Sequence, residues 1–191
     1  MTIQKHTKIL TVFSFLRLRS PDIFWYQWVY PTLIFALVYF GGYAAQEYLI
    51  NFDRSKLVDD INVLMGVLVG FYIAALAAVS SFTNENLDQI MKGRAPTFTM
   101  KRQGQDVVER MTRRRFLAVL FGYCASISIA LFVFGVAQGQ IEIVTLTNPW
   151  LKWTVSALVE VFWAIYLWLL ASLLVVTLLG LHYLIERMHR S

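Results

Sequence analysis

Hydrophobic residues along the chain gather into four long blocks separated by polar stretches. The blocks cover about residues 29–45, 61–82, 116–136 and 153–181. A helix needs about 17–25 mainly apolar residues to cross the hydrocarbon core of a bilayer, and every block reaches that length. The pattern therefore predicts an all-α integral membrane protein with four transmembrane helices, forming a single membrane domain over residues 1–191.

Two of the blocks are preceded by residues that typically begin a helix. Asp59 and Asp60 stand directly before the second block, and Asp is a favoured N-cap residue. Asn148 and Pro149 stand before the fourth block, where a proline suits the first helical turn. We therefore expect the second helix to begin after Asp60 and the fourth near Pro149.

The basic residues are distributed unevenly among the polar stretches. Of the 17 Lys and Arg residues, 14 lie in the N-terminal segment, in the connection 83–115 or at the C-terminus. The two remaining connections hold only Arg54, Lys56 and Lys152. Because Lys and Arg are enriched in cytoplasmic loops, both termini and the connection 83–115 are expected in the cytoplasm.

Composition argues against several classes of function. The net charge of +5 is compatible with nucleic-acid binding, but membrane orientation and anionic lipid account for it better. The chain has a single cysteine, and its three histidines are not at metal-ligand spacing from carboxylates. No serine has a base placed to activate it. We therefore expect no enzyme activity, no cofactor, no metal and no direct nucleic-acid binding.

Glu160 is an ionisable residue inside the fourth apolar block. Such residues usually face the interior of a bundle or a water-filled cavity. One interpretation is a pore-lining or gating group in an oligomer. The other is a neutral carboxyl group that hydrogen-bonds to a neighbouring helix, and the sequence leaves both open.

Small residues recur at every fourth position of the second block, at Gly66, Gly70, Ala74 and Ala78. This spacing gives a smooth helix face that allows close approach of another helix. The helix that packs against this face can belong to the same chain or to another copy. The pattern favours a homo-oligomer without proving it.

The connection 83–115 is the largest polar segment, and it predicts helical cytoplasmic extensions. Residues 83–92 continue the second helix, Gly93 and Pro96 break it, and a new helix begins with Asp106 as its cap. The fourth helix projects likewise through Glu186 to Arg190. The apolar residues of the connection need either one another or a docked cytosolic protein as cover; they are Leu87, Ile90, Phe98, Val107 and Met111. Arg102 and Arg110 belong to the same candidate docking surface.

About a quarter of the chain resembles a known family. The resemblance lies in the four-span layout and in the stretches Asn84-Glu85-Asn86-Leu87-Asp88, Lys92-Gly93-Arg94-Ala95-Pro96-Thr97, Thr112-Arg113-Arg114-Arg115-Phe116 and Leu120-Phe121-Gly122-Tyr123. These features resemble the KwaA family, the membrane subunits of the bacterial Kiwa antiphage defence systems. The resemblance implies a homo-oligomer, thought to be a tetramer, in the bacterial inner membrane. It also implies a KwaB-like cytosolic partner that binds DNA, and a membrane subunit without catalytic residues.

Two functions therefore compete. The first is a membrane-embedded sensor and scaffold that detects phage attack at the inner membrane and recruits a cytosolic DNA-binding effector. The alternative is a pore-forming or ion-conducting small membrane protein that permeabilises the membrane, with Glu160 at the pore.

Overall fold

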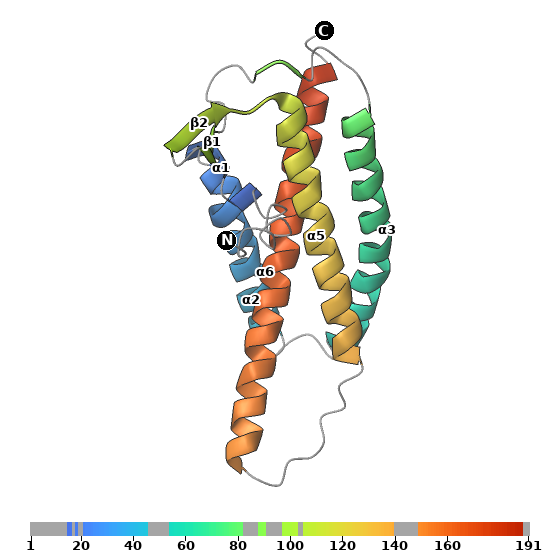
Figure 1. Cartoon of the computed structure of the whole chain (residues 1–191). Helices are drawn as coiled ribbons and strands as arrows, with labels where there is room; N and C mark the ends of the chain where they lie inside the picture. The colour runs from blue at the N-terminus through green and yellow to red at the C-terminus, as the bar shows by residue number, and fades with distance from the viewer. Residues whose placement is uncertain are drawn as a thin grey trace, which may run out of the picture.

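The protein is a set of long helices with one β-hairpin near one end (Figure 1). The computed structural model describes residues 15–16, 18, 21–45, 54–81, 88–90, 97–102, 105–139 and 149–188. Its elements are α1 (Pro21–Phe24), η2 (Trp25–Val29), α2 (Tyr30–Ala45), α3 (Arg54–Ser81), β1 (Thr97–Arg102), β2 (Gln105–Arg110), α5 (Arg113–Gly139) and α6 (Pro149–Met188).

The first apolar block belongs to a longer helical stretch than its hydrophobicity predicts. α1, the π-helical segment η2 and α2 follow one another without a gap from Pro21 to Ala45. In η2, Gln27 is buried and its side-chain amide donates a hydrogen bond to the Phe15 carbonyl. This bond ties the segment before α1 to the helix.

Three of the described helices are long and apolar enough to cross a membrane. They are Lys56–Ser81 in α3, Arg113–Ala137 in α5 and Trp153–Leu184 in α6. The helical prediction is therefore confirmed for the second, third and fourth blocks. The expected caps Asp59 and Asp60 are wrong, because α3 already begins at Arg54 and both residues lie inside it. Helix-compatible residues such as Lys56 and Leu57 extend the helix backwards past the two aspartates.

The helices stand side by side in the order α2, α6, α5, α3 (Figure 1). α6 packs against α2 on one side and α5 on the other, and α5 packs against α3 as well as α6. Of the apolar window of α5, 56% is buried inside the molecule, against only 11% for α3. The core therefore follows α5 and α6, while α3 leaves most of its surface uncovered.

The end of the molecule near the C-terminus carries a β-hairpin in place of the second predicted helical stalk. β1 and β2 pair antiparallel, from Thr97 opposite Arg110 to Arg102 opposite Gln105. The predicted helix from Asp106 is wrong, since Asp106 lies within β2 opposite Lys101. The segment alternates polar residues with β-formers such as Phe98 and Val107, and two such strands stabilise each other by pairing.

The other two predicted extensions have different outcomes. The continuation of α3 through Lys92 is wrong at Gln89 and Ile90, which are not helical; Ile90 forms an isolated β-bridge with Thr112. The projection of the fourth helix is confirmed as far as Met188, and Arg190 lies outside the described residues.

Candidate functional site

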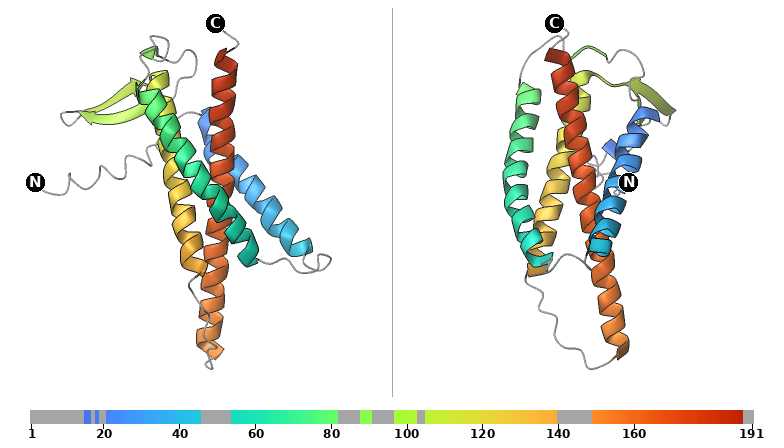
Figure 2. Two further views of the ribbon diagram at one scale, coloured as in Figure 1. Left: turned by 90° about the vertical axis from the view of Figure 1, so that its right-hand side faces the viewer. Right: turned by 180° about the vertical axis from the view of Figure 1, so that it is seen from behind.

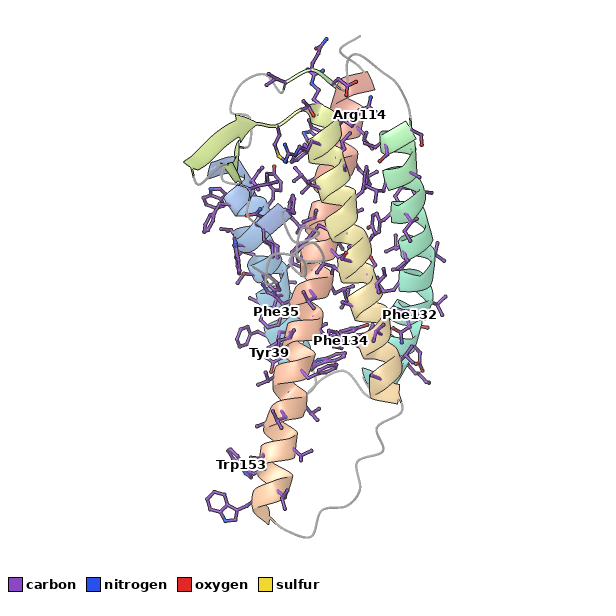
Figure 3. All side chains as sticks on the ribbon, in the orientation of Figure 1. Phe35, Tyr39, Arg114, Phe132, Phe134 and Trp153 are labelled. Carbon is purple, nitrogen blue, oxygen red and sulfur yellow. The ribbon has the colours of Figure 1, made fainter. Side chains whose placement is uncertain are left out.

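The base of the hairpin, residues 88–90 and 111–114, is held to the helices by one arginine. Arg114, in the first turn of α5, lies near the upper end of the helices in Figure 3. Its Nε lies 2.7 Å from Oδ1 of Asp88, and its Nη2 lies 3.0 Å from Oδ2. A guanidinium that donates two parallel bonds to one carboxylate fixes the relative orientation of both groups.

The third nitrogen of Arg114 reaches the end of α3. Nη1 donates to the carbonyls of Val79 and Ser80 at 3.4 and 3.5 Å. The last four carbonyls of a helix have no partner inside that helix, so this contact supplies donors that the helix lacks. Arg114 thereby joins the start of α5, the end of α3 and the Asp88 segment.

Backbone contacts also join the two segments of the base, residues 88–90 and residues 111–114. The Arg113 N–H donates to the Gln89 carbonyl at 3.3 Å, and Ile90 bridges Thr112. β2 ends at Arg110, two residues before Thr112. The direction in which the hairpin leaves α5 is therefore set by hydrogen bonds rather than by a free linker.

The predicted docking residues fall into different environments. Ile90 is 54% exposed, as a docking residue requires. Met111 is 1% exposed, so its assignment to a docking surface is wrong: it packs within the chain. Phe98, Arg102, Val107 and Arg110 all lie in the hairpin, and Leu87 lies outside the described residues.

Hydroxyl groups tie the helices together inside the apolar region. The Tyr72 hydroxyl of α3 lies 2.5 Å from the Thr177 hydroxyl of α6. Five residues earlier in α6, the Ser172 hydroxyl lies 3.0 Å from the Tyr123 hydroxyl of α5. These contacts were not predicted; the only signal in the sequence is the presence of Tyr, Ser and Thr within apolar blocks, and it does not reveal which groups meet.

Other buried polar atoms have no hydrogen-bond partner among the described residues. They are Asn62 Oδ1, Ser128 Oγ and Tyr166 Oη. Asn62 lies against Gly135 of α5, where an added Cβ would overlap its side-chain amide. Gly135 therefore permits the close approach of α3 and α5 at this point.

Glu160 lies near the end of the helix row opposite the hairpin. It stands two residues before Phe162, whose ring contacts Phe134 of α5 at a centroid distance of 5.6 Å. α5 ends at Gly139, soon after Phe134. The N-terminal part of α6, which includes Trp153, extends beyond that end of α5 (Figure 3). Glu160 is half-buried and has interaction partners, at the level of the last turn of α5.

The predicted small-residue face of α3 is uncovered. Gly66, Gly70 and Ala74 are exposed, and Ala78 is half-buried. An added Cβ on Gly66 or Gly70 would meet no atom of the described residues within 4 Å, in contrast to Gly135. Within the described part of the chain, these two glycines therefore have no packing partner.

Among the described residues, no group of three or more His, Cys, Asp or Glu is placed to hold a metal ion. No protein-family model, curated protein or solved structure matches the chain.

Proposed function

We propose that this protein is a sensor and scaffold subunit of an antiphage defence complex in the bacterial inner membrane. It detects phage attack at the membrane and recruits a cytosolic DNA-binding effector. The observation that carries the recruitment is a structured hairpin, fixed at its base by Arg114, at one end of three helices apolar enough to cross the membrane. The role in phage defence and the DNA-binding effector are what the KwaA resemblance implies. An ordered polar projection of this kind is suited to binding a partner outside the bilayer.

The proposal includes a fourth membrane span, formed by α1, η2 and α2 together. The stretch from Pro21 to Ala45 has 25 residues. At about 1.5 Å per residue it extends about 37 Å, more than the roughly 30 Å hydrocarbon core. With four spans, both termini lie on the same side of the membrane as the hairpin.

The cytoplasmic orientation of the hairpin is supported by charge. The connection 83–115 carries eight basic residues, whereas the two connections at the other end carry three. The end of α6 at Met188 lies at the same end of the molecule as the hairpin (Figure 1). The excess of Lys and Arg at this end favours a cytoplasmic location for the hairpin and the C-terminal end of α6.

A homo-oligomer is the third part of the proposal. Support comes from the uncovered face of α3 with Gly66 and Gly70, against which none of the described residues packs. In a membrane, association of helices depends on close backbone approach, because lipid covers apolar side chains as well as a helix does. A second copy is the occupant that such a face suits.

Co-purification in mild detergent tests the recruitment of an effector. The variant Arg110→Glu reverses a charge in the hairpin, and we expect it to lose most of the bound effector while its own yield is unchanged. The matched control is Lys152→Glu, which reverses a charge at the opposite end of α6. Full retention of the effector by the hairpin variant would contradict docking at this site.

A further inference from the structure

The hairpin projects sideways from the helices. In the side view of Figure 2 its strands run across the helix axes and extend beyond α5, away from the other helices. It starts directly beside the first turn of α5, at the end of an apolar helix. A ribbon that runs across membrane-spanning helices at their ends runs along the membrane surface, over the area that lipid occupies.

The register divides the hairpin into two different faces. Alternate residues of a strand belong to opposite faces, and directly paired residues share one. Phe98 pairs with Glu109, Met100 with Val107 and Arg102 with Gln105, so one face holds the large apolar residues Phe98, Met100 and Val107 together with Glu109, Arg102 and Gln105. The other face pairs Thr97 with Arg110, Thr99 with Val108 and Lys101 with Asp106.

The charge around the hairpin is positive. The connection 83–115 holds eight basic and four acidic residues. Lys101 and Arg102 end β1, and three arginines in succession begin α5. A basic segment directly beside a membrane span is attracted to the negative surface potential of anionic lipid.

We propose that the hairpin is an interfacial lipid-binding ribbon that lies flat on the membrane beside the helices. The face with Phe98, Met100 and Val107 enters the boundary between headgroups and acyl chains, as the apolar face of an interfacial helix does. Arg102, on the same face, contacts anionic phosphate groups, and Lys101 on the opposite face adds to the attraction of the hairpin for the anionic surface. The leaflet depends on the proposed orientation, but the binding does not depend on an effector.

This inference narrows the surface available to an effector. With the Phe98 face on lipid, the face that carries Arg110 remains accessible from the cytoplasm. Ile90, which is 54% exposed beside Thr112, adds to that surface. The base contacts of Arg114 then hold the ribbon at the height of the membrane surface.

Spin labels on single cysteines test the proposal on the full chain in nanodiscs. The substitutions Phe98→Cys, Met100→Cys and Val107→Cys sample one face; Thr99→Cys and Val108→Cys sample the other. The native Cys124 is fully buried and does not compete for the label. In nanodiscs with anionic phosphatidylglycerol, we expect labels on the first face to be accessible to oxygen and protected from a water-soluble nickel reagent. Labels on the second face show the opposite.

Charge dependence supplies the second arm of the experiment. Replacing Lys101 and Arg102 by Gln should lower the ratio of hairpins immersed in the membrane to hairpins exposed to water about fivefold for each cation removed. Nanodiscs of pure phosphatidylcholine should have a similar effect on the unchanged chain. Equal accessibility of both faces in anionic nanodiscs would overturn the proposal, as would immersion of the Thr99 face.

A protein partner is the remaining outcome. If the labels on the Phe98 face become protected only after the effector is added, that face binds protein and the lipid proposal is wrong. Loss of effector binding with intact lipid immersion would contradict the proposed recruitment alone. The two failures are therefore distinguishable.

Discussion

At the scale of single residues, polar groups inside the apolar helices make opposite contributions. Tyr72 and Tyr123 share hydrogen bonds with residues of α6, whereas the buried Tyr166 hydroxyl has no partner in the described part of the chain. A buried hydroxyl without a partner is unfavourable, while a paired one stabilises the contact between helices. The same side chain therefore has a different energetic role at each position.

Replacing each tyrosine by phenylalanine tests this difference. Tyr72→Phe should lower the free energy of unfolding by about 0.6–1.7 kcal/mol, since it removes the bond to Thr177. Tyr166→Phe should leave stability unchanged or raise it, since it removes only an unpaired group. Unfolding by denaturing detergent in mixed micelles measures both. Equal losses in the two variants would contradict the assignment.

Glu160 keeps both of its interpretations at this scale. It lies inside the candidate membrane span Trp153–Leu184 of α6, half-buried and two residues before Phe162, whose ring contacts Phe134 of α5. Its role as a pore-lining or gating group stays a prediction.

At the scale of elements, the hairpin and its base are what distinguish this molecule from a plain row of helices. In the described part of the connection 83–115, the predicted helix from Asp106 is replaced by a ribbon, whose base is held by Asp88, Gln89 and Arg114. Arg114 is only 23% exposed, although Asp88 is 59% exposed. The pair therefore contributes mainly orientation, because ion pairs near the surface add little to global stability.

Arg114→Lys should loosen the base without unfolding the helices. Lysine keeps the charge but cannot donate two parallel bonds to Asp88 and also reach the carbonyls at the end of α3. We expect faster amide hydrogen exchange at Arg113 and through β2, with unchanged exchange in the middle of α5. Asp88→Asn is a matched variant that removes the carboxylate and should have a smaller effect, because the contacts to α3 remain. Unaltered exchange in Arg114→Lys would contradict the role of the base.

At the scale of the whole molecule, the glycines of the helices fall into two groups. Some allow close packing within the chain, and others lie on a face that is free for another copy. Gly135 faces Asn62 within the chain, whereas Gly70 of α3 faces no described atom within 4 Å. In the proposed homo-oligomer, the fold of one chain and the assembly of several copies therefore depend on different positions. This separation exists because α3 packs along one side only and leaves the other uncovered.

Gly70→Ile should weaken the oligomer and leave the fold of each chain intact. Gly135→Ala should destabilise the chain by about 1–3 kcal/mol, because the new methyl group overlaps the Asn62 amide. Light scattering in detergent gives the oligomer mass, and detergent-induced unfolding gives the stability of the chain. An unchanged mass for Gly70→Ile would exclude this face as the contact between copies.

The sequence by itself determined the positions of the apolar helices. About 20 consecutive apolar residues have no stable place in water, so the second, third and fourth blocks predict α3, α5 and α6 with small errors at their ends. The charge imbalance and the small residues at Gly66 and Gly70 were also visible without a structure.

Only the tertiary structure decided how these parts meet. The burial of Met111, the pairing of Tyr72 with Thr177 and the contacts of Arg114 join residues that are distant in sequence. Hydrophobic periodicity describes one helix at a time and contains no information about such pairs. The hairpin was missed for the same reason, since Phe98 and Val107 favour a strand only when a partner strand lies beside them.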